Sequence, residues 1–183
     1  MVKGGSLENE GQVVVFTGGG KGKTTAALGL ACRAVGHGRT AAFIHFSGPE
    51  RPELGDVAAT RKFSAKLTMI GIECQAGEPS YLDDFDESVP TVEAALDRAR
   101  QLVLGAECDV LVLDDINPLL HGGIIEEASI LDLINARPEG STIVLTGRFA
   151  PEAILRMADV VTDFTEVKHP AQAGIEPRKG IDF

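Results

Sequence analysis

The sequence predicts an α/β fold, a single domain built on a mainly parallel sheet of about six strands with helices on both faces. Short apolar runs alternate with longer segments of helical periodicity along most of the 183 residues, a pattern typical of right-handed strand-helix-strand crossovers. The runs are largely apolar, and their alternation with helices implies a parallel sheet covered on both faces. A glycine-rich loop joins the first run to the first helix.

The apolar runs are expected to form the strands because each is short and bounded by turn or polar residues. In chain order these runs are 12–16, 39–46, 66–72, 109–115 and 141–147, with 159–167 as the candidate for a sixth strand. Helical patterns lie between them, at 26–37, 89–107 and 125–138. Residues 1–11 are expected to be a flexible tail before a folded domain at 12–183, in which the stretch 168–183 is irregular.

Composition is that of an ordinary globular domain, with 44% apolar and 24% charged residues. Lys and Arg number 17 against 27 Asp and Glu, a net charge of −10, which argues against a nucleic-acid partner and against a basic membrane-binding face. No run approaches the roughly 18 apolar residues of a membrane span, and the opening residues lack a signal-peptide pattern. The three cysteines form no CxxC pair, as is common in a reducing compartment. We therefore expect a cytoplasmic protein.

The loop 17–25 reads TGGGKGKTT and is the most informative segment. Its glycines allow backbone N–H groups to turn toward a phosphate chain, and the positive end of the following helix faces the same ligand. Lys23 supplies a mobile cation, and the hydroxyl of Thr24 can bind Mg²⁺. A solvated connector is the alternative, but the position between a buried strand and a helix favours a phosphate-binding loop. The expected ATP-binding residues are Gly18, Gly19, Gly20, Lys21, Gly22, Lys23, Thr24, Thr25 and Arg148.

Two aspartates end the fourth predicted strand, at Asp114 and Asp115. Parallel strands present their carboxyl ends at one edge of a sheet, where ligands bind, so these carboxylates should lie near the glycine loop. Either can hold Mg²⁺, or Mn²⁺, directly or through water, and complete the site that Thr24 begins. The alternative for Asp114 is a helix N-cap.

Two histidines and one arginine are weaker candidates. His37 and His45 lie near expected element ends, where a histidine is more often a hydrogen-bonded structural residue than a base. Arg148 follows the fifth strand at the ligand edge and either reaches a phosphate or is an ordinary exposed arginine.

Four segments together resemble the P-loop corrinoid adenosyltransferase family, which acts on cob(I)yrinic acid a,c-diamide or cob(I)alamin. The segments are TGGGKGKTTAALGLACRAVGHG, VLVLDDIN, NARPEGSTIVLTGR and VKHPAQAGIEPRKGIDF. The general phosphate-loop pattern has glycine where this chain has Thr17. In having threonine at this position, the loop resembles that of the family. The resemblance runs from about residue 12 to the C-terminus, is poor over 47–88, and implies a P-loop NTPase-like fold.

The resemblance implies that ATP is an alkylating agent: the Co(I) of a reduced corrinoid attacks the ribose 5′ carbon and triphosphate departs, in adenosylcobalamin biosynthesis or salvage. Residues 18–25 would hold the triphosphate, Lys23 and Lys21 would neutralise it as the catalytic residues, and Thr24 with Asp115 would hold magnesium. A reductase supplying Co(I) is implied as a partner, and a homodimer is compatible with the resemblance.

The chain departs from the family pattern at two places. Asp114-Asp115 stands where the family has Asp-Glu, which shortens the metal-binding arm by one methylene. The family's GFTW-like segment, which faces the corrinoid, lines up with GEPSYLDDF, where Tyr81 or Phe85 would take its place.

Two alternatives stay open, because a phosphate loop does not specify which atom is attacked. One is an ATP-binding protein or NTPase with a different acceptor. The other is a non-catalytic nucleotide- or corrinoid-binding homologue.

Overall fold

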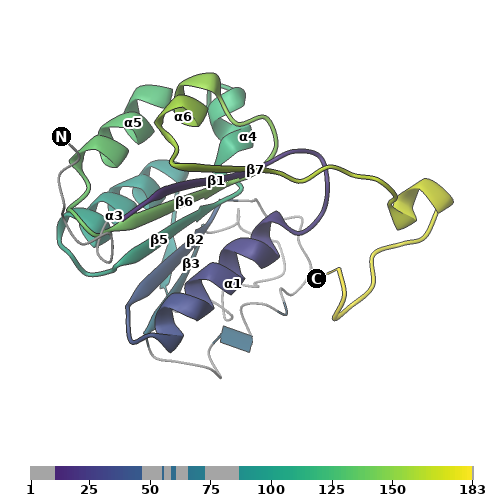
Figure 1. Ribbon diagram of the computed structural model, residues 1–183, viewed down its shortest axis with the longest axis horizontal. Helices are drawn as coiled ribbons and strands as arrows, with labels where there is room; N and C mark the ends of the chain where they lie inside the picture. The colour runs from purple at the N-terminus through teal and green to yellow at the C-terminus, as the bar shows by residue number, and fades with distance from the viewer. Residues whose placement is uncertain (1–10, 47–54, 56–58, 61–65, 73–86, 183) are drawn as a thin grey trace, which may run out of the picture.

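The computed structural model describes residues 11–46, 55, 59–60, 66–72 and 87–182. In this part of the chain seven strands form one sheet, in the order β4-β3-β2-β5-β6-β1-β7, and all paired neighbours are parallel (Figure 1). The strands are β1 Val13–Thr17, β2 Ala41–His45, β3 Leu67–Ile72, β4 Glu87–Val89, β5 Val110–Asp114, β6 Thr142–Thr146 and β7 Val160–Asp163.

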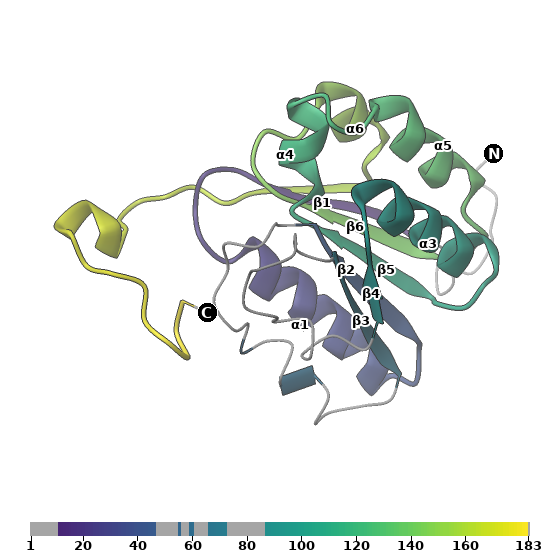
Figure 2. The same cartoon turned by 180° about the vertical axis from the view of Figure 1, so that it is seen from behind.

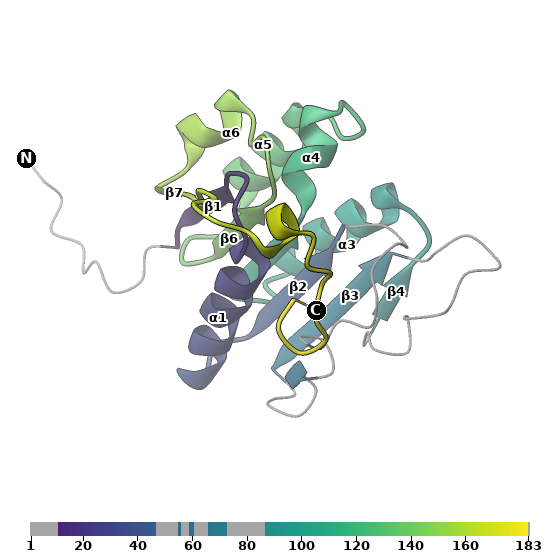
Figure 3. The same ribbon diagram turned by 90° about the vertical axis from the view of Figure 1, so that its right-hand side faces the viewer.

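The helices cover both faces of the sheet, as predicted. They are α1 Lys23–Gly36, α3 Val92–Leu104, α4 Ile116–His121, α5 Glu127–Ala136 and α6 Glu152–Met157, with a 3₁₀ turn at Pro170–Ala173. In the views of Figures 2 and 3, α1 lies on one face and α3 to α6 lie on the other. The predicted α/β class with a parallel sheet is confirmed.

The core divides into two clusters because successive strand residues point to opposite faces. Val13 and Val15 pack in the cluster beneath α3 to α6, whereas Val14 between them packs with Ala27 and Ala31 of α1. The central strands β2 and β5 are buried along their whole length. This explains why their sequences are apolar at almost every position.

All six predicted strand segments form strands, but the elements differ from the predictions in detail. β4 was not predicted, since three residues are too few to show a pattern, and the expected helix at 89–107 begins later because Val89 belongs to that strand. The hydroxyl of Thr91 caps α3 by accepting a hydrogen bond from the N–H of Ala94. The helices α4 and α6, at six residues each, are also too short for periodicity to indicate them.

The edge strand β7 differs from the interior strands, because all four of its residues are exposed. Its position beside β1 brings the chain that follows it, from Phe164 onward, to the end of β1. None of the helices in the described ranges is long and apolar enough to cross a membrane.

Burial predicts which positions hold the sheet together. Leu111 is fully buried in β5. Leu111→Ala should lower the free energy of unfolding of the protein by about 3 kcal/mol, because the substitution leaves a cavity. Val161→Ala in β7, where the valine is 48% exposed, should cost less than about 0.5 kcal/mol. Urea denaturation of both variants measures the difference, and equal losses would contradict the packing described here.

Candidate functional site

The loop between β1 and α1 has a backbone that requires glycine. Gly18 and Gly22 have φ angles of +94° and +108°, in the region that side chains disfavour. A Cβ on Gly18 would lie 2.1 Å from the Oδ1 of Asp163 and 2.6 Å from the carbonyl oxygen of Phe164. Gly22 is the N-cap of α1 and has no side chain to satisfy the first N–H groups of the helix, so these remain available to an anion.

The chain leaving β7 supports this loop from one side. The N–H of Gly20 donates to the carbonyl of Phe164 at 2.6 Å, and the N–H of Phe164 donates to the carbonyl of Thr17 at 2.9 Å. The Phe164 ring packs edge-on against Phe16, with ring centroids 5.6 Å apart. Sequence reasoning missed Phe164, because its role depends on β7 lying beside β1.

Lys23 lies within the curve of the loop. Its Nζ donates to the carbonyl oxygens of Gly18 at 2.8 Å and Gly20 at 2.7 Å. Burial and, after it, the positive charge of Arg148 lower the pKa of Lys23, while Asp115, Asp114 and Asp163 act in the opposite direction. The predicted residues Lys23, Arg148, Asp114 and Asp115 are therefore gathered around one point at the carboxyl edge of the sheet.

Asp114 connects four elements at that edge. Its carboxylate has no exposure to solvent. Oδ1 accepts a hydrogen bond from the Thr146 hydroxyl at 2.6 Å, and Oδ2 accepts from Nδ1 of His45 at 2.7 Å and from the Thr24 hydroxyl at 3.3 Å. Because these partners come from β6, β2 and α1, the carboxylate lies where the strands and the phosphate loop meet.

Asp115 has a different environment. It is the N-cap of α4, with φ +58° and no side-chain capping bond, and its N–H donates to the hydroxyl of Thr146 at 2.9 Å. The N-cap position suggested for Asp114 thus belongs to Asp115. The hydroxyl of Thr24 contacts Asp114, although the family resemblance paired it with Asp115.

Arg148 follows β6 in a turn that lies against the start of the phosphate loop. The N–H of Ala150 donates to the hydroxyl of Thr17 at 3.3 Å, so the threonine that replaces glycine in the general loop pattern has a contact here. Arg148 is exposed. Its neighbour Phe149 has φ +59° and a ring stacked on His121 with centroids 5.0 Å apart.

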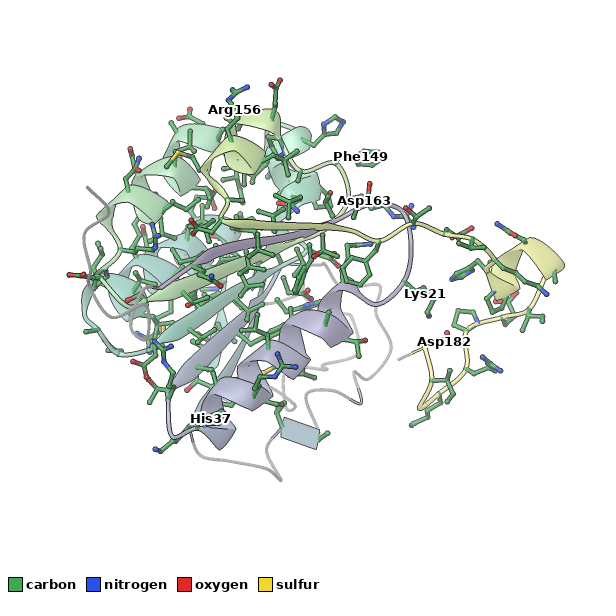
Figure 4. All side chains as sticks on the ribbon, viewed as in Figure 1. Lys21, His37, Phe149, Arg156, Asp163 and Asp182 are labelled. Atoms are coloured by element: carbon green, nitrogen blue, oxygen red, sulfur yellow. The ribbon has the colours of Figure 1, made fainter. Side chains whose placement is uncertain are left out.

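Lys21 points away from the loop interior, toward the C-terminal segment (Figure 4). Its Nζ contacts Oδ1 of Asp182 at 2.5 Å. This hydrogen bond, followed by one from the N–H of Arg178, lowers the pKa of Asp182 to about 2. Lys21 and Lys23 therefore have separate partners, although the sequence places them two residues apart.

The oxygen donors at this edge fit a magnesium ion. Hydroxyl and carboxylate oxygens from Thr24, Asp114 and Asp115 are ligands that Mg²⁺ prefers. Within the described ranges no three His, Cys, Asp or Glu side chains form a metal-binding group. A magnesium site completed by phosphate oxygens and water requires only one or two protein ligands, so the residues present suffice.

Three further predicted residues do not lie among the described residues of this site. His37 lies at the far end of α1, as its C-cap. Tyr81 and Phe85, the candidates for a corrinoid-facing surface, lie outside the described residues.

Comparison with known proteins identifies relatives along almost the whole chain. The family model described as ATP:corrinoid adenosyltransferase BtuR/CobO/CobP matches residues 9–183. A corrinoid adenosyltransferase of Pseudomonas aeruginosa is 33% identical over 178 residues, which cover 96% of this chain and 85% of that protein. The corrinoid adenosyltransferase CobA of Salmonella typhimurium is 31% identical over 179 residues, covering 96% and 87%.

A solved structure shows a similar fold. The KaiC-like protein of Pyrococcus horikoshii OT3 superposes with a TM-score of 0.54 at 23% identity, covering 84% of this chain and 73% of that one. At this identity the likeness concerns the fold alone.

Two neighbouring glycines test the loop geometry. Gly18→Ala should destabilise the protein by at least about 1–2 kcal/mol, the cost of a side chain in the left-handed region, and should weaken ATP binding because the loop must shift away from Asp163. Gly19→Ala is the matched control for stability, since a Cβ there has nothing within 4 Å. Urea denaturation of both variants measures the loss of stability, and ATP titration of Gly18→Ala measures the loss of affinity. Equal stability of the two variants would show that the loop is not held as described.

Proposed function

We propose that this chain, which belongs to the ATP:corrinoid adenosyltransferase family, transfers the 5′-deoxyadenosyl group of ATP to the Co(I) of a reduced corrinoid. The electron pair of Co(I) forms the cobalt–carbon bond while the bond from C5′ to the phosphate oxygen breaks, and the pair from that bond leaves with triphosphate. The observation that carries this proposal is the family match across residues 9–183. The phosphate loop supports it as a site for the leaving group.

The chemistry requires no side chain to act as nucleophile or base, so the protein contributes position and charge. Backbone N–H groups of residues 18–25 and the N-terminus of α1 bind the triphosphate. Lys23 exchanges its bonds to two loop carbonyls for bonds to phosphate oxygens, and Arg148 adds a second positive charge. Because negative charge on the triphosphate grows as the bond breaks, these cations stabilise the transition state more than bound ATP.

Thr24 and the two aspartates would hold Mg²⁺ or Mn²⁺. Thr24 and Asp115 would bind the ion, directly or through water, and Asp114 would act on it through the hydroxyl of Thr24. When bound, the ion supplies positive charge to the leaving phosphates. Asp114 is better suited to the indirect role, since its two oxygens already accept hydrogen bonds inside the fold.

The remaining parts of the proposal concern the corrinoid and the partners. Residues 12–183 form the catalytic domain. Tyr81 or Phe85 provides an aromatic wall for the macrocycle, because cobalt in the Co(I) state must be shielded from water. A separate reductase supplies Co(I), the protein works in the cytoplasm, and it forms a homodimer.

Lys23→Ala tests the role of the phosphate loop. Removing a cation from the departing triphosphate should lower the single-turnover rate by roughly 100-fold to 1,000-fold, or about 3–4 kcal/mol. Lys21→Ala is the matched control and should have a smaller effect, because Lys21 is exposed and paired with Asp182. The rates are measured with chemically reduced corrinoid in excess. An unchanged rate in Lys23→Ala would mean that this loop does not hold the departing phosphates.

A further inference from the structure

We infer that His45 is a positioning residue of this site: through Asp114, its imidazole orients the hydroxyl of Thr24 toward the metal ion and the phosphates. This inference rests on the proposed function, because it concerns the same magnesium and triphosphate site. It assigns a role to a histidine for which the sequence favoured a structural hydrogen bond over a role as a base.

The sheet brings His45 and Asp114 together. Both are the last residues of neighbouring parallel strands, β2 and β5, and the register pairs them directly. His45 is 3% exposed, and its Nδ1 lies 2.7 Å from Oδ2 of Asp114. A carboxylate oxygen is a hydrogen-bond acceptor, so we take Nδ1 of His45 as the donor in this contact.

The same carboxylate oxygen connects His45 to Thr24. Oδ2 of Asp114 accepts the hydroxyl of Thr24 at 3.3 Å. A hydroxyl has one proton and two lone pairs. When the proton points to Asp114, the lone pairs point away from the buried carboxylate and are available to a cation at the phosphate loop. The orientation of Asp114 therefore determines which side of Thr24 faces the ligand.

Two side chains fix that orientation, one on each carboxylate oxygen. Thr146 donates to Oδ1 at 2.6 Å and also accepts the N–H of Asp115, which makes it part of the backbone turn after β5. His45 donates to Oδ2, the oxygen that also accepts the hydroxyl of Thr24. Without His45 the carboxylate can rotate toward Thr24 or draw in water, and the hydroxyl loses its defined direction.

An isosteric pair of substitutions isolates this hydrogen bond. His45→Asn keeps an N–H donor where Nδ1 was. His45→Leu introduces a side chain of nearly the same shape as asparagine but without a donor. The measured quantity is the metal effect, the ratio of the ATP dissociation constant in EDTA to that in Mg²⁺, obtained by calorimetric titration without corrinoid. Partners that orient metal ligands in this way typically change metal affinity 10-fold to 100-fold. His45→Leu should therefore lower the metal effect by about tenfold or more. ATP affinity in EDTA should change little in either variant, and His45→Asn should retain most of the metal effect.

A double variant tests whether the effect passes through Thr24. In Thr24→Val, which lacks the hydroxyl, adding His45→Leu should lower the metal effect no further, because coupled residues are not additive. Urea denaturation checks that each variant folds. If His45→Leu does not fold, His45→Phe, a ring without nitrogen, replaces it under the same expectation.

Three results would overturn the inference. One is an unchanged metal effect in the leucine variant. Another is equal weakening of ATP binding in EDTA and in Mg²⁺, which would indicate a structural role alone. The third is a parent protein whose ATP affinity does not respond to Mg²⁺, which would also remove the proposed metal site. The first two leave the proposed function intact.

Discussion

The buried carboxylate of Asp114 is the constraint on which the ligand edge of this protein depends. A charge without exposure to solvent is costly unless hydrogen-bond donors surround it. The donors come from β2, β6 and α1, so satisfying one carboxylate holds the ends of two strands and the start of a helix in fixed relation. Leaving a buried polar group without its hydrogen-bond partner typically costs about 1–3 kcal/mol.

The phosphate loop depends on that arrangement from one side and on β7 from the other. Gly18 passes so close to Asp163 that no side chain fits, and Phe164 receives the N–H of Gly20. Lys23 bonds to the carbonyls of its own loop, so a cation already lies inside the loop that we propose as the site of the departing phosphates. Charges that are held in position before the reaction begins stabilise the charge that develops in the transition state.

Much of the fold could be predicted because its signals are local. Apolar runs indicated the strands, and the glycine loop indicated both the first crossover and the carboxyl edge where Lys23, Arg148 and the two aspartates meet. The three-residue strand β4 and the short helices α4 and α6 escaped prediction because periodicity needs length.

The contacts within the site could not be predicted, because they depend on strand order and register. His45 and Asp114 are 69 residues apart in the sequence, and nothing in either segment indicates that β2 pairs with β5. The contacts of Thr146 with Asp114, Thr17 with Ala150 and Lys21 with Asp182 likewise arise only when the sheet is assembled.

The identity of the phosphate-containing product tests the proposed adenosyl transfer most directly. The protein is incubated with ATP, Mg²⁺ and a chemically reduced corrinoid, and the phosphate products are separated and quantified. We expect intact triphosphate in one-to-one proportion with adenosylated corrinoid, and no ATP consumption when the corrinoid is omitted. Production of ADP and phosphate at the same rate with or without corrinoid would contradict it, and the phosphate loop would then belong to an ordinary ATP hydrolase.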